Sequence, residues 1–181
     1  MMKRICVYCG AHPGNGQTFA RTAANAARMI VAAGYGIVYG GGRVGLMGII
    51  ADAALAAGGD VIGVIPSSLA TREIAHDSLS KLYVTDGMHE RKLRMTELAD
   101  AFLALPGGYG TMDELFEALT WRQLNFHDKP IAVLNVAGYY DGLLSQVERM
   151  VRDEFVTAKN RELLWSVSTP EEFLERLAFE A

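Results

Sequence analysis

Positive charge is scarce in this sequence. Lys and Arg together number 17 against 21 Asp and Glu, so the 181-residue chain has a formal net charge of −4. A field of that sign repels nucleic acid and anionic membrane surfaces, so we expect neither as a partner. Any site for an anion must therefore be built locally, from particular loops and side chains.

Long apolar runs and targeting signals are also missing. No apolar run approaches the roughly 20 residues that span a bilayer. The first ten residues, MMKRICVYCG, hold a short apolar run with a tyrosine inside it and no small-residue cleavage site. They predict a first strand rather than a signal peptide, and we expect a cytoplasmic protein with no membrane partner.

Cysteine is limited to Cys6 and Cys9, which form a CxxC pair. A metal site would need a second pair, or two histidines at matching spacing, and neither follows. On a strand, a spacing of three residues places the two side chains on opposite faces, which does not suit a redox pair. We expect two reduced, buried thiols, and nothing in the sequence indicates a metal or an organic cofactor.

Apolar runs alternate regularly with helical patterns along the whole chain. Strands are predicted at residues 4–10, 35–42, 60–66, 81–86, 101–108, 129–136 and 162–168. Helices are predicted at residues 19–34, 45–59, 88–100, 111–126, 139–155 and 169–179, with an irregular polar segment at 67–80. Continuously apolar strands that alternate with helices predict a parallel sheet covered on both faces. The expected fold class is therefore α/β, a Rossmann-like doubly wound sheet that forms a single domain over residues 1–181.

Three small-residue loops are expected at one edge of this sheet. Open α/β sheets bind ligands at the carboxyl ends of their strands. The stretches CGAHPGN (9–15), YGGGRVGLMG (39–48) and PGGYGT (106–111) all fall at that edge. Together they outline a binding site.

The 39–48 loop contains a formal GxGxxG, formed by Gly40, Gly42 and Gly45. This pattern suggests a dinucleotide, but here it follows the second strand instead of the first. Asp60, at the distance expected of a ribose-binding acid, opens the next strand instead of ending it. NAD(P) binding is therefore a minor alternative, and Gly42 is counted among the expected substrate-binding residues.

The PGGYGT loop is more informative. Gly107, Gly108 and Gly110 allow the backbone to approach a ligand closely. The peptide N–H groups then lie at the N-terminus of the 111–126 helix, where roughly half a positive charge favours phosphate without any basic side chain. Thr111 adds a hydroxyl, so the loop predicts a phosphate cradle.

Two interpretations compete for Glu114. Thr111 and Glu114 have the spacing of a capping box, which would need no function. Alternatively, Glu114 is a catalytic carboxylate beside the phosphate, and Glu117, three residues on, lies on the same helical face. Two converging carboxylates suit general-base work or the stabilisation of a developing cation.

The segment MHERK (88–92) opens the helix before the fifth strand. A solvated basic face explains Lys92, whereas Arg91 has a planar, permanently charged fork that would suit a phosphate or carboxylate in the same site. The four histidines, His12, His76, His89 and His127, lack any metal or triad context. We treat them as surface or capping residues.

Two of these motifs resemble those of a known family. PGGYGTMDE (106–114) fits a PGGxGTxxE signature, and MHERK lies upstream of it. The segments CVYCG, YGGGRVGLMG, VIGVIP and TWRQLNFHDKPIAVLNVAGYYDGLL extend the similarity over nearly the whole chain, whereas GAHPGN departs from a more serine-rich loop. The chain resembles the LOG ("Lonely Guy") proteins, cytokinin riboside 5′-monophosphate phosphoribohydrolases that are also labelled lysine decarboxylase-like.

The resemblance implies hydrolysis of the N-glycosidic bond of adenosine 5′-monophosphate or an N6-substituted (cytokinin) riboside 5′-monophosphate, releasing free base and ribose 5-phosphate. It implies Arg91 and Glu114 as the catalytic pair, without a cofactor. Glu114 would stabilise the oxocarbenium-like ribose or orient water, and Arg91 would hold the phosphate or assist the departing base. The expected substrate-binding residues are Gly42, Glu73, Met88, Lys92, Gly107, Gly108, Gly110, Thr111 and Glu117.

Two other functions stay open. A pyridoxal-phosphate lysine decarboxylase would need a Schiff-base lysine, and Lys92 is the only one near the predicted edge. A non-catalytic nucleotide-binding module would keep the glycine loops and Arg91 but would not need Glu114. Phe116, Trp121 and Phe126 occupy more than one side of the 111–126 helix, and together with the resemblance they predict a homodimer.

Overall fold

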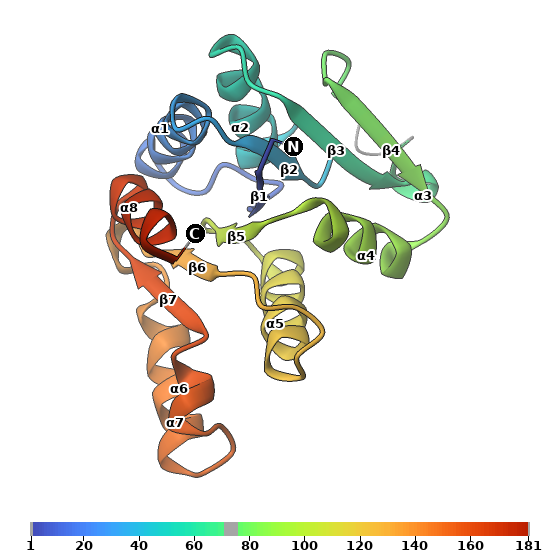
Figure 1. The fold of residues 1–181 in the computed structure, drawn as a ribbon. Helices are drawn as coiled ribbons and strands as arrows, with labels where there is room; N and C mark the ends of the chain where they lie inside the picture. The colour runs from blue at the N-terminus through green and yellow to red at the C-terminus, as the bar shows by residue number, and fades with distance from the viewer. Residues whose placement is uncertain (1, 71–75, 181) are drawn as a thin grey trace.

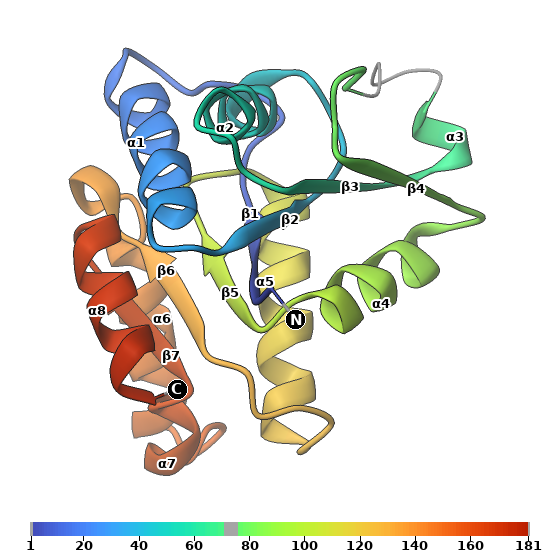
Figure 2. The same ribbon diagram turned by 45° about the horizontal axis from the view of Figure 1, so that its top comes forward.

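A seven-stranded parallel sheet forms the centre of the molecule (Figures 1 and 2). The computed structural model describes residues 2–70 and 76–180. All six neighbouring strand pairs are parallel, in the order β4-β3-β2-β1-β5-β6-β7. The strands are β1 (Arg4–Tyr8), β2 (Gly36–Tyr39), β3 (Val61–Pro66), β4 (Lys81–Thr85), β5 (Ala101–Ala104), β6 (Ile131–Leu134) and β7 (Leu164–Val167).

Helices cover both faces of the sheet (Figure 2). They are α1 (Thr18–Ala32), α2 (Gly45–Ala56), α3 (Ser67–Ala70), α4 (Met88–Leu98), α5 (Tyr109–Gln123), α6 (Asp141–Arg152), α7 (Ala158–Arg161) and α8 (Pro170–Glu180), with a 3₁₀ turn η1 at Val136–Gly138. Two apolar cores result: one packs the sheet against α1, α2 and α8, the other against α4, α5 and α6. Neighbouring residues of a strand alternate between them, as Phe102 and Leu103 of β5 do.

The sheet has its topological switch point between β1 and β5. From β1 the chain moves outward through β2, β3 and β4, then returns to the other side of β1 to form β5, β6 and β7. Cys6 of β1 therefore has Val38 on one side and Phe102 on the other. The loops that follow β1 and β5 diverge here toward opposite faces, which leaves room for a ligand at their carboxyl ends.

The predicted fold class is confirmed, and all seven predicted strands are present. The two thiols are free and buried, and Cys6 and Cys9 belong to opposite cores as the strand spacing predicts. Among the described residues, no helix is long and apolar enough to cross a membrane.

The differences lie at the ends of elements. The short helices α3 and α7 were not predicted, although Thr157 caps α7 by accepting a hydrogen bond from the Asn160 N–H. The predicted N-cap of the last helix, Thr169, accepts one from the Glu172 N–H at 3.2 Å. Helix α5 begins at Tyr109, two residues before the predicted start, and this shift matters for the site.

Candidate active site

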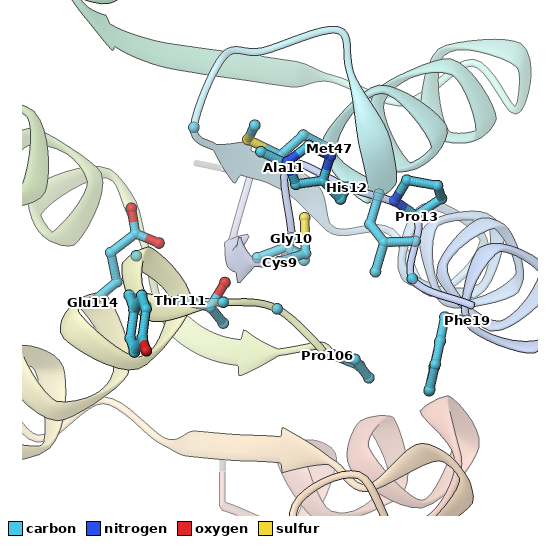
Figure 3. A pocket seen from close by; sticks show the side chains of 18 of the residues that line it. Cys9, Gly10, Ala11, His12, Pro13, Phe19, Met47, Pro106, Thr111 and Glu114 are labelled. Atoms are coloured by element: carbon cyan, nitrogen blue, oxygen red, sulfur yellow. The ribbon is translucent and has the colours of Figure 1, made fainter.

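A cavity of about 540 Å³ opens at the switch point. Its walls come from the loop after β1, the end of β2, the starts of α2 and α4, the Pro106–Thr111 loop after β5, and Tyr139 beyond β6. Figure 3 shows these side chains converging from both halves of the sheet, with Glu114 and Phe19 on opposite sides. The volume is in the range of small-molecule sites.

Arg91 and Glu114 form a buried ion pair at one side of this cavity. Arg91 Nη1 donates to Glu114 Oε1 at 2.8 Å, and each side chain is about 10% exposed. Arg91 Nε donates to the Val64 carbonyl at 2.9 Å and Nη2 to the Gly40 carbonyl at 3.4 Å. The guanidinium is thus fixed by the sheet, and it holds one oxygen of a carboxylate that lines the cavity.

Burial dominates the electrostatics of Glu114. Removal from water raises the pKa of the Glu114 carboxyl above its ordinary value, and the charge and hydrogen bond of Arg91 oppose that rise. The charge of Asp113 adds to the rise, and that of Lys92 opposes it more weakly than Arg91 does. A largely buried carboxylate next to a fixed cation can stabilise a positive charge that develops beside it in the cavity.

The capping-box interpretation of Glu114 is wrong. Because α5 begins at Tyr109, its N-cap is Gly108, and no side chain satisfies the cap. Thr111 is therefore inside the first turn, and the Glu114 carboxylate bonds to Arg91 rather than to a backbone N–H. The first N–H groups of α5 have no acceptor within the helix, and the residues that carry them line the cavity.

The glycines of the 106–111 loop serve different needs. A Cβ on Gly107 would approach Thr111 Oγ1 to 2.1 Å and the Gly10 nitrogen to 2.8 Å, so close packing excludes a side chain there. Gly108 and Gly110 have nothing within 4 Å of a Cβ, so open space adjoins them on the cavity side of the loop. Gly107, Gly108, Gly110 and Thr111 all line the cavity, as predicted.

The earlier glycine cluster is explained by internal packing. A Cβ on Gly40 would meet Arg91 Nη2 at 2.3 Å, and one on Gly45 would meet the Ala11 carbonyl carbon at 2.3 Å. These residues let Arg91 and the β1 loop approach the backbone, and they need no pyrophosphate to account for them. Gly40 lines the cavity, whereas Gly42 is buried outside it.

The remaining predicted residues divide into three groups. Met88 lines the cavity. Lys92 and Glu117 do not: Lys92 Nζ of α4 pairs with Glu117 at 3.0 Å and with Asp113 at 3.1 Å, both in α5. Burial alone would lower the pKa of Lys92, but the hydrogen bonds to Glu117 and Asp113 outweigh it and raise it. Glu73 lies outside the described residues.

Several cavity residues were not predicted from the sequence. His12, treated as a surface residue, lines the cavity from within the 9–15 loop that was expected at this edge. Phe19 and Tyr139 lie in edge-to-face contact, with ring centroids 5.8 Å apart, and both line it. Neither residue belongs to the three loops that were expected to outline the site, and no motif in the sequence marks them. In the part of the chain that the structure describes, no three His, Cys, Asp or Glu side chains gather as metal ligands would.

Comparisons with known proteins give one consistent family. Residues 47–177 match the family model described as "Possible lysine decarboxylase". The "Probable cytokinin riboside 5'-monophosphate phosphoribohydrolase LOGL1" of Oryza sativa subsp. japonica is 46% identical over 174 residues, which are 96% of this chain and 78% of that protein. The "Cytokinin riboside 5'-monophosphate phosphoribohydrolase LOG1" of Arabidopsis thaliana is 43% identical, over 97% of this chain and 82% of that protein.

Solved structures agree with the fold. The molybdenum cofactor binding protein from the phototrophic bacterium Rippkaea orientalis superposes with a TM-score of 0.74 at 25% identity, covering 99% of this chain and 98% of that one. The similarity in arrangement thus extends over both halves of the sheet and includes both sides of the cavity.

Proposed function

This chain belongs to the family of cytokinin riboside 5′-monophosphate phosphoribohydrolases, and we propose that it hydrolyses the N-glycosidic bond of adenosine 5′-monophosphate or of an N6-substituted riboside 5′-monophosphate. The products are the free base and ribose 5-phosphate. The observation that carries this proposal is the buried Arg91–Glu114 pair, which faces a cavity that also holds an open helix N-terminus.

Glu114 is the proposed catalytic residue. Cleavage of an N-glycosidic bond develops oxocarbenium character on the ribose, and a carboxylate beside it stabilises that charge or orients the attacking water. Oε1 accepts the hydrogen bond from Arg91, which leaves Oε2 for the substrate. Because the side chain is about 10% exposed, its charge is little screened by solvent.

Arg91 is proposed to act through Glu114. Three of its N–H groups are directed to Val64, Gly40 and Glu114, so the guanidinium has one orientation. Its positive charge favours the ionised carboxylate that the reaction requires, against the effect of burial. This arrangement supports a positioning role better than direct capture of the 5′-phosphate.

The 5′-phosphate is proposed to bind at residues 107–111. The free N–H groups of the first turn of α5 and the Thr111 hydroxyl suit an anion, and no acidic residue lies in that turn. The apolar walls around Phe19, Met47 and Met88 suit the uncharged base. The cavity thus combines groups that suit an anion with apolar walls, as a nucleotide ligand requires.

A lysine decarboxylase fits the cavity poorly. The lysines of the chain are Lys3, Lys81, Lys92, Lys129 and Lys159, and none is among the described residues that line the cavity. Lys92, the nearest to it in sequence, has a raised pKa in its pairs with Glu117 and Asp113, which opposes the neutral amine that a Schiff base needs.

The test is chromatography of reaction mixtures that contain AMP, N6-isopentenyl-AMP or the two corresponding nucleosides. The proposal expects free base from at least one monophosphate and much less from its nucleoside, because the nucleoside lacks the group that the α5 N-terminus binds. Base released equally from nucleosides and monophosphates would contradict the phosphate cradle. No release from any of them would contradict the hydrolase.

The homodimer and the cytoplasmic location remain predictions. A hollow on the outer side of α5, lined by Met112, Phe116 and Trp121 among others, supports pairing of two copies through this helix, and Phe126 beyond it is 75% exposed. Light scattering should give twice the monomer mass for the native chain and less for Trp121→Glu. Phe179→Ser, which removes an exposed ring on α8, is the matched control. Cell fractionation tests the location.

A further inference from the structure

The segment that follows β6 is built as a turn that presents two tyrosines. Ala137 and Gly138 both have positive φ, 52° and 72°, which reverses the chain within two residues. Asn135 holds the turn closed, because its Oδ1 accepts from the Tyr140 N–H at 2.7 Å and its Nδ2 donates to Asp141 Oδ1 at 2.7 Å. Tyr139 follows directly and lines the cavity.

The two tyrosines hold the backbone on either side of Pro106. Tyr140 Oη donates to the Leu105 carbonyl at 2.7 Å from a fully buried position. Tyr139 Oη donates to the Gly107 carbonyl at 2.5 Å. On the far side, the Pro106 carbonyl accepts from the Gly10 N–H at 3.1 Å. Three successive carbonyls are therefore fixed by groups from two other loops.

The bond to Gly107 has a consequence for the next N–H. The described chain has no cis peptide bonds, so the Gly107 C=O and the Gly108 N–H lie in one plane and point in opposite directions. Without the tyrosine hydroxyl, the Gly107 carbonyl would lose this hydrogen bond, and neither flanking residue has a side chain that would restrict rotation of the Gly107–Gly108 peptide. Tyr139 thus fixes the direction of the Gly108 N–H at the N-cap of α5.

We propose that Tyr139 is a positioning residue for the substrate's 5′-phosphate, acting through the Gly107–Gly108 peptide. This inference rests on the proposed function, since it assigns the N-terminus of α5 to the phosphate. The ring of Tyr139 is itself held, by edge contacts with Phe19 at 5.8 Å and with Tyr140 at 5.1 Å between centroids. A Phe at this position keeps those contacts and removes only the hydroxyl.

The test compares native protein with Tyr139→Phe, by calorimetric titration with ribose 5-phosphate and by steady-state kinetics with AMP. A lost hydrogen bond of ordinary net strength predicts that the Kd for ribose 5-phosphate and the KM for AMP rise about 3- to 10-fold. The kcat should stay within about 2-fold, and the inhibition constant of adenosine, which has no phosphate, should not change. Tyr35→Phe is the matched control, because it removes a hydroxyl just before β2, at the opposite end of the sheet from the cavity.

Each outcome bears on one claim or the other. The positioning role is overturned if Tyr139→Phe binds ribose 5-phosphate as tightly as the native protein does, or if its affinities for ribose 5-phosphate and adenosine weaken equally. In either case, base release by the native protein still upholds the hydrolase. Weaker ribose 5-phosphate binding in a protein that releases no base upholds the positioning role and overturns the hydrolase. A native protein that binds no ribose 5-phosphate overturns the positioning role, and one that also releases no base overturns both claims.

Discussion

Replacing Arg91 by Met should expose how strongly Glu114 depends on its partner. The variant keeps an apolar stem of similar length but leaves a buried carboxylate, about 10% exposed, without its cation. It also leaves the carbonyls of Val64 and Gly40 without their donors. Breaking a buried pair from one side is expected to lower the free energy of unfolding by about 3–5 kcal/mol near neutral pH.

The loss should depend on pH, with a sign that follows from Glu114. The pKa of Glu114 is raised in the folded chain, so folding favours its protonated form. The contribution of Glu114 to the free energy of unfolding therefore falls as the pH rises through its folded-state pKa. Without Arg91 the folded pKa is higher still, which widens that fall. The stability difference between native protein and Arg91→Met should therefore be larger at about pH 8 than at about pH 4.

Urea unfolding at both pH values measures these differences. Arg94→Met is the matched control on the same helix: Arg94 is 43% exposed and pairs with Glu97 three residues on, so its loss should be within about 1 kcal/mol. The double variant Arg91→Met, Glu114→Gln removes both charges. Its loss of unfolding free energy should be about 1–3 kcal/mol smaller than the sum of the losses in the two single variants. A loss no larger than that of Arg94→Met, or one independent of pH, would show that Glu114 does not depend on Arg91.

Three further predictions concern the cavity. The pKa of Glu114 is raised above the ordinary value for Glu, and only the ionised carboxylate serves the reaction. The kcat/KM should therefore fall as the pH drops below this raised pKa. A pH–rate profile that stays flat down to about pH 4 would contradict this. In thermal melts, Gly107→Ala should lower the free energy of unfolding by about 1–3 kcal/mol, because the new Cβ would meet Thr111 and Gly10. Gly110→Ala lies within α5 and next to open space, so it should be neutral or stabilising. Equal losses in the two variants would show that close packing is not what excludes a side chain at Gly107. Burial raises the pKa of the Cys9 thiol, and the charge of Glu114 raises it further. Iodoacetamide at about pH 8 should therefore leave Cys9 unmodified in the native protein and alkylate it only after unfolding. Rapid labelling of the native protein would show that the Cys9 thiol is accessible to solvent.

Much of the fold was predictable because its signals are local and repeated. Each apolar run of four to six residues gave a strand, and each glycine stop or Thr-Pro start gave a helix end. The parallel sheet then placed three glycine loops at one edge, and all three contribute residues to the cavity, together with Arg91 and Glu114. The resemblance to a family added the reaction, which no pattern of glycines could specify.

The misplaced residues have two physical causes. Lys92 directly follows Arg91, and because a helix turns about 100° per residue the two side chains face different surroundings. Glu117 lies on nearly the same face of α5 as Glu114, but it pairs with Lys92 and does not line the cavity. Whether a carboxylate caps its own helix or crosses to another depends on where the helix begins, and a two-residue shift of α5 decided it for Glu114. The hydrogen bond from Tyr139 to Gly107 joins residues that are 32 positions apart, and no local pattern in a single sequence predicts such a contact.

The most direct test of the whole account is the turnover and binding of one substrate by native protein and by Glu114→Gln. Free base formed from N6-isopentenyl-AMP or AMP would be quantified by chromatography, and the Kd of the same nucleotide would be measured on the same preparations. Glu114→Gln should lose about 10²- to 10³-fold in kcat and keep its affinity within a few-fold, because the amide oxygen still accepts from Arg91 while the charge is gone. Undiminished release of base by Glu114→Gln would contradict the central role of this carboxylate.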